Sequence, residues 1–311
     1  MKASSMILPV AAGLTGVGVL LATILANRGG ASSPGGVVPL SPKAPGVTKA
    51  PTGKGVFIRD VKHAGNTPAD LVAWVAKLRL DFVILQALWQ NEHTDTSSYK
   101  QLPDHVRALQ ANGTRVWLFG WVRSEEQRRD YFARFMGAAA TKLNADGYII
   151  NAEAPYYGQS KFSAARDLIE RCRRSYPGRI GFTSYGGGYA MHPSFPWANF
   201  STLDFGMPQI YDTHHRLGKD YPTRAMEQWA KLYGADNIIP IWGASNAHTP
   251  QQMIDIISRT PFAPGCAWWD FYWLTMNAKR AQVVTNFVLG SPQVGADTRL
   301  IRGAGGDLWA A

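Results

Sequence analysis

The sequence predicts an α/β fold, a (β/α)8 barrel in which eight parallel strands alternate with helices, and three observations predict it. Eight strand-like apolar runs begin 25 to 33 residues apart, which is about the length of one strand–helix unit. Most of the runs are continuously apolar, as expected of parallel strands covered on both faces. The glycine fingerprint of the rival doubly wound sheet is missing, since Gly186–Gly188 matches neither GxGxxG nor GKS/T.

The expected strands and helices follow one another along the chain. The strands are Gly55–Val61, Phe82–Gln90, Arg115–Val122, Gly147–Ala154, Ile180–Tyr185, Phe205–Tyr211, Ile238–Ala244 and Gly265–Trp273. Helix-start signals occur at Thr67–Asp70, Ser124–Gln127 and Thr249–Gln252, which combine a capping residue with Pro or with a capping-box partner. The fifth gap, 186–202, is rich in Gly, Pro and aromatic residues, and we expect an ordered loop over the barrel mouth there.

Composition divides the 311-residue chain into four segments. Residues 1–28 contain the uncharged stretch 6–26, which is just long enough to span a bilayer. This segment is either a signal peptide or an uncleaved transmembrane anchor, and both alternatives export the protein. Residues 29–54 are a Gly/Pro/Ser-rich linker, 55–290 form the barrel, and 291–311 are a weakly patterned tail.

Charge, cysteine and histidine usage restrict the class of protein. The formal charge of +10 is scattered over the expected helices, which favours attraction to an anionic polymer or lipid surface over nucleic-acid binding. Cys172 and Cys266 fall on distant elements, so we expect buried free thiols rather than a disulfide. The seven histidines show no HxxxH or HxH spacing, and no GxSxG elbow is present. The sequence therefore predicts no metal site, no cofactor and no nucleophilic serine.

The octet Asp146–Glu153 is the most informative segment of the chain. It reads as a buried strand that ends in an acid, with an amide two residues earlier. Residues two apart in a strand point to the same face, so Asn151 and Glu153 should project together. In a barrel enzyme this end of the strand faces the active site.

The other strand ends carry aromatic residues, amides and acids. Aromatic faces stack on sugar rings, and amides and acids bind the hydroxyls. The candidates are Asp60, Tyr185, Gln209, Tyr211, Asp212, Trp242, Trp269 and Asp270, with Gln86, Trp89 and Trp121 at further strand ends. Strand-end acids are often paired with a basic residue, and Arg59 or Arg123 could serve Asp60 or Asp270.

Three of these strand-end motifs resemble glycoside hydrolases. The pattern DGxxxNxE at Asp146–Glu153 looks like the fourth-strand DGxDxDxE signature of glycoside hydrolase family 18, with Ile149 and Asn151 in place of two Asp residues. The Asn version is similar to family 85, the endo-β-N-acetylglucosaminidases. Met207–Asp212 and Gly265–Asp270 resemble the sixth and last strands of family 18.

The resemblance implies substrate-assisted cleavage of 2-acetamido sugars, in which the acetamido oxygen attacks the anomeric carbon. It assigns the catalytic acid to Glu153 and the orientation of the acetamido group to Asn151. Tyr211 would bind the acetamido carbonyl, Gln209 and Asp212 would line the same subsite, and Trp269 would be its floor. The glycan expected is peptidoglycan or a chitin-like polymer.

Other functions stay open. Family 25 lysozymes resemble the chain in having acids after the first and fourth strands, which would pair Asp60 with Glu153. A non-catalytic glycan-binding barrel, tethered to a membrane or built into a virion, is suggested by the replaced Asp residues. The weakly hydrophobic segment 6–26 also looks like the releasable anchors of phage lysis enzymes, an endolysin-like feature. A nucleic-acid binder is supported by net charge alone.

Overall fold

A computed structural model describes residues 50–90, 95–97, 99–211, 218–261 and 263–289. The expected signal peptide or anchor, most of the expected linker and the expected tail lie outside the described residues, as does Asp212. Within the described ranges, no helix is both long enough and apolar enough to cross a membrane.

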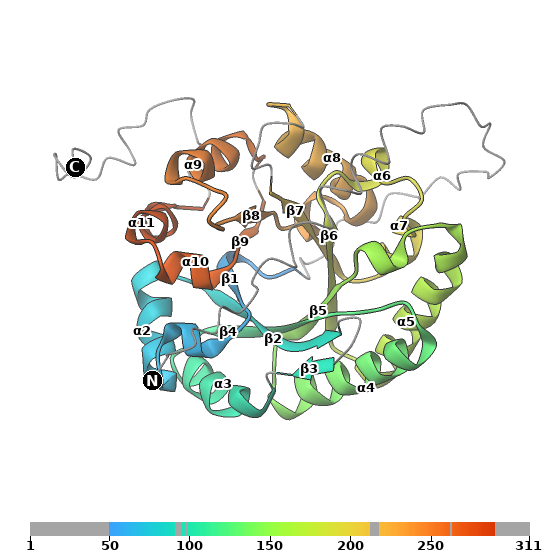
Figure 1. Cartoon of the computed structure of the whole chain (residues 1–311), viewed down its shortest axis with the longest axis horizontal. Coiled ribbons are helices and arrows are strands. Elements are labelled where there is room, and N and C mark those ends of the chain that lie inside the picture. Colours follow the sequence, from blue (N-terminus) through green and yellow to red (C-terminus); the bar gives the residue numbers. More distant parts are fainter. Residues whose placement is uncertain (1–49, 91–94, 98, 212–217, 262, 290–311) are drawn as a thin grey trace, which may run out of the picture. The chain divides into compact units, whose positions relative to one another are not determined.

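The strands form one sheet that closes into a barrel (Figure 1). Its order is β1-β9-β8-β7-β6-β5-β4-β2, all neighbours are parallel, and β1 pairs with β2 to complete the ring. A ninth strand, β3, lies antiparallel beside β2 and was not expected. The strands are β1 (Gly53–Ile58), β2 (Phe82–Gln90), β3 (Asp95–Ser97), β4 (Arg115–Trp121), β5 (Gly147–Asn151), β6 (Arg179–Tyr185), β7 (Phe205–Ile210), β8 (Ile241–Gly243) and β9 (Gly265–Trp269). The predicted (β/α)8 barrel is confirmed.

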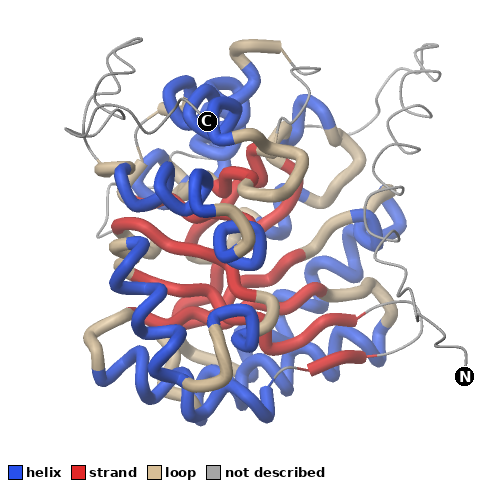
Figure 2. Tube along the Cα trace, turned by 60° about the vertical axis from the view of Figure 1, so that its left-hand side comes forward, coloured by secondary structure: helices blue, strands red, loops and turns tan. Residues whose placement is uncertain are grey.

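Helices surround this ring of strands, as Figures 1 and 2 show. The helices are α2 (Pro68–Leu78), α3 (Leu102–Ala111), α4 (Glu126–Lys142), α5 (Phe162–Ser175), α6 (Gly188–Met191), α7 (Trp197–Phe200), α8 (Tyr221–Tyr233), α9 (Pro250–Arg259), α10 (Phe271–Thr275) and α11 (Ala278–Asn286). Short 3-10 helices are η2 (Val61–Ala64), η3 (Tyr99–Gln101), η4 (Ala154–Tyr156), η5 (Gln159–Lys161) and η6 (Ala235–Asn237).

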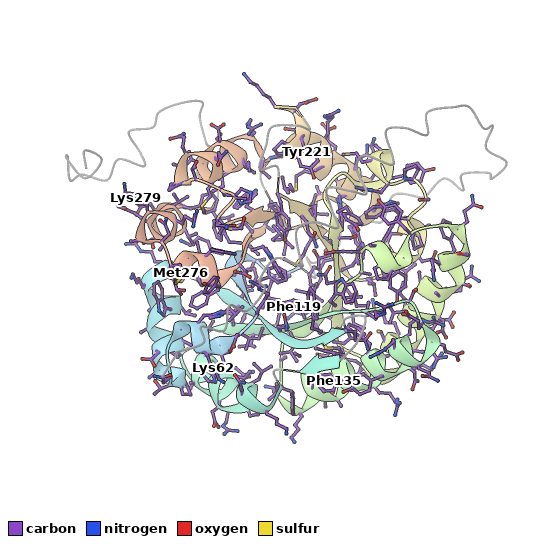
Figure 3. All side chains as sticks on the ribbon, viewed as in Figure 1. Lys62, Phe119, Phe135, Tyr221, Met276 and Lys279 are labelled. Atoms are coloured by element: carbon purple, nitrogen blue, oxygen red, sulfur yellow. The ribbon has the colours of Figure 1, made fainter. Side chains whose placement is uncertain are left out.

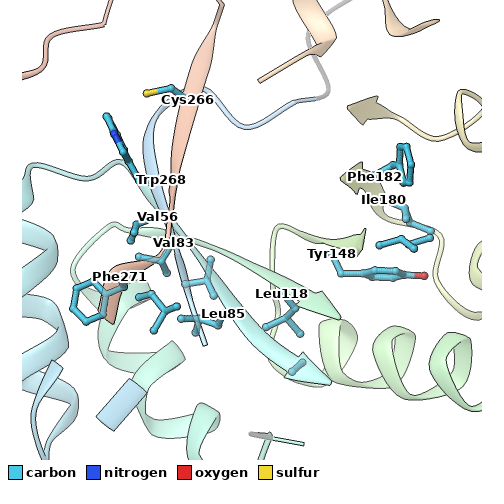
Figure 4. Close-up of a cluster of buried hydrophobic side chains, with 14 of the residues drawn as sticks. Val56, Val83, Leu85, Leu118, Tyr148, Ile180, Phe182, Cys266, Trp268 and Phe271 are labelled. Carbon is cyan, nitrogen blue, oxygen red and sulfur yellow. The ribbon is translucent and has the colours of Figure 1, made fainter. Parts of the chain in front are cut away.

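Alternation along the strands produces two separate apolar cores. One set of side chains fills the barrel interior: Ala50, Phe57, Phe82, Ile84, Trp117, Phe119, Ile149, Phe205, Met207, Ile239, Ile241 and Ala267. Figure 3 labels Phe119 inside the ring and Phe135 of α4 outside it. The intervening residues pack against the helices, and Figure 4 shows Val83, Leu85, Leu118, Tyr148 and Trp268 among them. This period of two decides which strand-end residues can face the mouth.

Aspartates at the amino end of three strands hold neighbouring strands together. Asp81, Asp146 and Asp204 immediately precede β2, β5 and β7. Each carboxylate accepts a hydrogen bond from a backbone amide of the preceding barrel strand, from Lys54, Val116 and Ile180 at 2.7–2.9 Å. The backbone amide of each Asp in turn donates to the backbone carbonyl of the residue whose amide its carboxylate accepts, at 2.8–2.9 Å. Asp146 of the DG motif is therefore a structural residue at the opposite end of β5 from Asn151.

Of the eight expected strands, Phe82–Gln90 has the expected bounds, and the other seven differ at one or both ends by one to four residues. The barrel begins before residue 55, because β1 starts at Gly53 and Ala50 is already buried in the interior core. β8 is shorter than Ile238–Ala244, since Pro240 has no amide hydrogen to donate to the ladder. Ile238 makes only an isolated bridge to Gly206.

Two of the three expected helix starts are confirmed. Thr67 and Thr249 cap α2 and α9, each within a complete capping box that includes Asp70 or Gln252. The expected cap at Ser124 is wrong, because α4 begins at Glu126 and its capping position is Glu125. The carbonyl of Ser124 accepts a hydrogen bond from Arg129 instead.

The segment 186–202 contains two short helices, α6 and α7, where a plain loop was expected. Aromatic stacking covers the outer face of β6 at this point, since Phe182 stacks on Phe200 at 4.3 Å and on Trp229 at 5.4 Å between ring centroids. A compact aromatic cluster thus replaces the long helix that covers the other strands.

The two cysteines are buried free thiols, as the sequence predicts. Cys172 lies on α5 and Cys266 on β9. Burial raises the pKa of Cys172 to about 12, so its thiol stays protonated and unreactive at neutral pH.

Candidate functional site

The carboxyl ends of β5 and β7 bring an acid and two amides together. Gln209 donates from Nε2 to Glu153 Oε1 at 2.9 Å and to Asn151 Oδ1 at 3.4 Å. The same amide lies 3.4 Å from Thr183 Oγ1 on β6. The expected projection of Asn151 and Glu153 to one face is confirmed, and both lie above the interior core residue Ile149.

Burial controls the protonation of Glu153. Desolvation raises the pKa of its carboxyl group above the ordinary value, while hydrogen bonds from Gln209 and Asn151 to the ionised form lower it by less. The net result is a carboxyl group that keeps its proton to higher pH than an exposed glutamate. A raised pKa is what a general acid at near-neutral pH requires.

Two tyrosines lie beside this carboxyl group. Burial raises the pKa of Tyr211, and the negative charges of Glu153 and Asp270 raise it further. Burial also raises the pKa of Tyr185, and Glu153 is again the nearby negative charge. Both phenols therefore lie within electrostatic reach of Glu153 and remain neutral hydrogen-bonding groups at any ordinary pH.

Trp269 lies at the end of β9 with its ring partly exposed toward the mouth. Beneath it are Phe57 and Phe119 of the interior core, with ring centroids 5.4 and 5.8 Å away. An indole ring supported from below in this way offers a flat apolar surface of the kind on which sugar rings stack. The peptide bond that follows it, to Asp270, is cis.

Asp270 is almost completely buried and forms an ion pair with Arg59 of the segment after β1. Desolvation raises the pKa of its carboxyl group, and the Arg59 guanidinium opposes the rise. The expected pairing of a strand-end acid with Arg59 is confirmed for Asp270. Arg123, the other basic candidate, pairs with Glu125.

Two expected site residues do not reach this cluster. Trp242 is wrong as a mouth residue, because its ring packs outward against Trp268 and Phe287 and donates a hydrogen bond to Thr260. Ile241 faces the interior, and a one-residue step along the strand turns Trp242 to the helices.

Asp60 was expected to bind substrate or to pair with Glu153, but its side chain makes a structural contact. Its side chain caps η2 and accepts a hydrogen bond of 3.0 Å from the backbone amide of Lys62. This contact gives no support to the expected pairing of Asp60 with Glu153. The acid near Tyr211 and Trp269 is Asp270.

A second aromatic surface lies next to Asn151. Trp89 and Trp121 are paired across β2 and β4, and their rings stack at 5.3 Å with 21° between planes. Trp121 is in turn paired with Asn151 of β5. Both tryptophans were candidates because they lie at strand ends. Their stacking could not be predicted, because the register shift between Gln86 and Leu88 is what places Trp89 opposite Trp121.

No cluster of three or more His, Cys, Asp or Glu side chains that could hold a metal ion occurs within the described part of the chain. The chemical groups gathered at the mouth are the Glu153 carboxyl group, two amides, two neutral phenols and a supported indole, with the Arg59–Asp270 ion pair beside the indole. This set suits acid–base chemistry on a polyhydroxylated ligand.

The sequence matches no family model and no curated protein sequence. Solved structures are similar in fold. A GH113 β-1,4-mannanase superposes with a TM-score of 0.55 at 13% identity, covering 76% of this chain and 97% of the mannanase. A class V chitinase from Pseudomonas fluorescens Pf-5 gives 0.55 at 8% identity, covering 75% and 98%.

The active domain 2 of a thermostable chitinase from Pyrococcus furiosus gives a TM-score of 0.53 at 15% identity, covering 71% of this chain and 84% of that domain. At identities this low, the likeness to these three structures establishes the shared (β/α)8 fold and leaves the activity to be argued from the site.

Proposed function

We propose that the protein is a glycoside hydrolase that cleaves a glycan built from N-acetylhexosamine, with peptidoglycan as the substrate and a chitin-like polymer as the neutral alternative. The observation that carries the proposal is the hydrogen-bonded set of Glu153, Gln209 and Asn151 at the barrel mouth. The supported Trp269 ring provides the adjoining sugar surface. The fold shared with chitinases and a mannanase is consistent with this activity.

The proposed reaction needs one enzyme carboxyl group. Glu153 donates its proton to the glycosidic oxygen as the bond to the anomeric carbon breaks, and the substrate's own acetamido oxygen forms a new bond to that carbon. Glu153, now a carboxylate, then takes a proton from water, whose oxygen attacks the anomeric carbon and releases the acetamido group. Asn151 and Tyr211 hold the acetamido group in position.

The replaced residues of the family 18 pattern support the simpler, family 85-like form of this mechanism. Ile149 is fully buried in the interior core, and its side chain has no titratable group that could accept or donate a proton. Asn151 is also buried, and its amide can only donate or accept hydrogen bonds. A relay of protons between neighbouring acids is therefore replaced by fixed amide contacts from Asn151 and Gln209.

We also propose that the enzyme is an exported endo-β-N-acetylglucosaminidase or lysozyme-like glycosidase. Residues 1–28 would direct it to the cell envelope as a signal peptide or as an anchor through 6–26. The net charge of +10 favours contact with an anionic wall polymer.

A non-catalytic glycan-binding barrel is the second candidate. It is favoured by the hydrogen bond from Gln209 that occupies Glu153 Oε1 and by the absence, among the described residues that contact Glu153, of a second acid. This candidate predicts binding of a glycan without turnover.

The test uses the full chain with purified peptidoglycan and with chitin oligosaccharides, and measures new reducing ends and the configuration of the first product. Substrate assistance predicts release of reducing ends with retained configuration. Inversion would contradict the acetamido mechanism, and glycan binding with no release of reducing ends would favour the binding barrel.

A further inference from the structure

The ion pair between Arg59 and Asp270 places a cation at the edge of the candidate sugar surface. Arg59 follows β1, and its guanidinium carbon lies 5.8 Å from the centre of the Trp269 ring. Its side chain is 42% exposed, whereas that of Asp270 is 1% exposed. The arginine is therefore open to a ligand, and the aspartate that holds it is not.

The hydrogen bonds of Arg59 leave part of its donor capacity unused. Its Nε donates to Asp270 Oδ2. A guanidinium carries five N–H donors, of which Nε supplies one. Within the described residues, neither Nη atom of Arg59 makes a hydrogen bond to the protein. Planar, paired N–H groups of this kind match the two oxygens of a carboxylate.

Asp270 fixes the direction of these donors. Its carboxylate is immobilised by burial at the capping position before α10. A partly exposed arginine ordinarily samples many rotamers, and each contact it makes with a ligand then carries an entropic penalty. The ion pair with the buried Asp270 carboxylate reduces that penalty in advance, because Arg59 is already held beside Trp269.

The same location lies close to the proposed catalytic acid. Tyr211 is within electrostatic reach of both Glu153 and Asp270, and Tyr211 and Trp269 both pack against the interior core at the carboxyl ends of their strands. A sugar that stacks on Trp269 would have substituents near Arg59, because the guanidinium lies beside that ring. An uncharged 2-acetamido sugar has no group that needs a cation there.

We propose that Arg59 binds a carboxylate carried by the sugar on Trp269 or by its direct neighbour, so that the preferred substrate is an acidic 2-acetamido glycan. This proposal rests on the proposed glycosidase function and narrows it. The carboxylate could come from a lactyl ether on the sugar ring or from a peptide attached to that ether. Both sources present the same chemical group to the guanidinium.

The experiment compares matched glycans that differ in charge alone. Peptide-free glycan strands with free lactyl carboxylates are used as they are and after conversion of those carboxylates to neutral amides. Intact peptidoglycan, in which the peptide supplies the carboxylates, separates the two sources. The full chain should cleave the acidic strand with a kcat/KM roughly 10- to 100-fold above that for the amidated strand, the usual strength of a hydrogen bond to a charged group.

Removing Arg59 alone would leave Asp270 buried without a partner, which destabilises a protein by itself. The informative variant is therefore the double substitution Arg59→Gln/Asp270→Asn, which removes both charges and leaves a polar amide at each position. Its kcat/KM ratio between acidic and amidated strands should fall to near one. Arg134→Gln, an exposed ion-pair arginine on α4, is the control and should leave the ratio unchanged.

The possible outcomes separate the inference from the function on which it rests. Cleavage of both strands at equal rates by the wild type, or a preference that survives in the double variant, overturns the role of Arg59. If no glycan is cleaved, the proposed function fails. Binding of the two strands to the Glu153→Gln variant then decides the inference, and equal affinity for both strands overturns it.

Discussion

Gln209 on β7 donates a hydrogen bond of 2.9 Å to Glu153 beyond β5, across 56 residues of sequence. This contact ties the carboxyl group of Glu153 to a strand of the barrel. It also stabilises the ionised form of that acid while burial opposes it, so the protonation of Glu153 depends on the balance of two named effects.

The stability of the protein should report this balance. Because burial raises the pKa of Glu153, the folded state holds the carboxyl proton more tightly than the unfolded chain does. Above the ordinary carboxyl pKa the unfolded chain ionises freely, so Glu153 destabilises the fold at neutral pH and not in acid. We expect Glu153→Gln to be more stable than wild type at pH 7, with the difference vanishing below about pH 4.

Urea unfolding across this pH range is the measurement. Glu170→Gln, an exposed glutamate on α5, is the control and should show no such dependence. A wild type that is as stable as Glu153→Gln at pH 7 would mean that the carboxyl group is well solvated.

The pH dependence of activity should shift in a stated direction when Asn151 is changed. A general acid must be protonated, so kcat/KM should fall as pH rises through the raised pKa of Glu153. The hydrogen bond from Asn151 lowers that pKa, and Asn151→Leu removes it. We expect the alkaline limb of the profile to move to higher pH, together with a lower kcat from the unheld acetamido group. An alkaline limb that stays in place would assign it to another residue.

The stacked pair of Trp89 and Trp121 should contribute to long substrates more than to short ones. Replacing Trp121 with Ala removes one stacking surface, which is worth about 0.5–1.5 kcal/mol, or roughly 2- to 10-fold in KM. Kinetics on glycan chains of graded length give the test. An equal change in KM for the shortest cleavable chain would show that the pair lies at the cleavage site itself.

Gly147 should resist substitution for reasons unrelated to chemistry. A Cβ there would lie 2.3 Å from the carbonyl oxygen of Arg179 and 2.5 Å from the Trp117 ring, at a φ of +156°. We expect Gly147→Ala to lower the free energy of unfolding by roughly 1–3 kcal/mol. Gly113 has a positive φ but open space where a Cβ would lie, so Gly113→Ala tests backbone strain without a steric clash. It should lower the free energy of unfolding by less than Gly147→Ala does. Equal losses would show that the barrel relaxes around residue 147.

The sequence was sufficient for the parts of the site that depend on local periodicity. Strand parity predicted that Asn151 and Glu153 share a face, and both contact Gln209 although β5 ends at Asn151. The apolar repeat placed that strand in a barrel. Trp242 was chosen for its place near a strand end without this alternation: Ile239 and Ile241 face the interior, so Trp242 between Ile241 and Gly243 faces the helices. One residue is enough to turn a side chain from the mouth to the helices.

Other features depend on contacts that local patterns do not contain. Arg59 and Asp270 are 211 residues apart, and the sequence could offer Arg59 only as one of two basic partners. The cap at Ser124 failed because α4 begins at Glu126, one residue later than a cap at Ser124 requires, and the Ser124 carbonyl accepts a hydrogen bond from Arg129. The aromatic cluster of α7 replaces a helix through tertiary packing between Phe182 and Phe200, which has no period in the sequence.

The catalytic role of Glu153 is tested by comparing cleavage by three proteins. Reducing ends released from peptidoglycan and from chitin oligosaccharides are measured for wild type, Glu153→Gln and the exposed control Glu170→Gln. We expect Glu153→Gln to lower kcat by about 10²- to 10⁴-fold while glycan binding is retained, and Glu170→Gln to behave as wild type. Undiminished cleavage by Glu153→Gln would contradict this catalytic role.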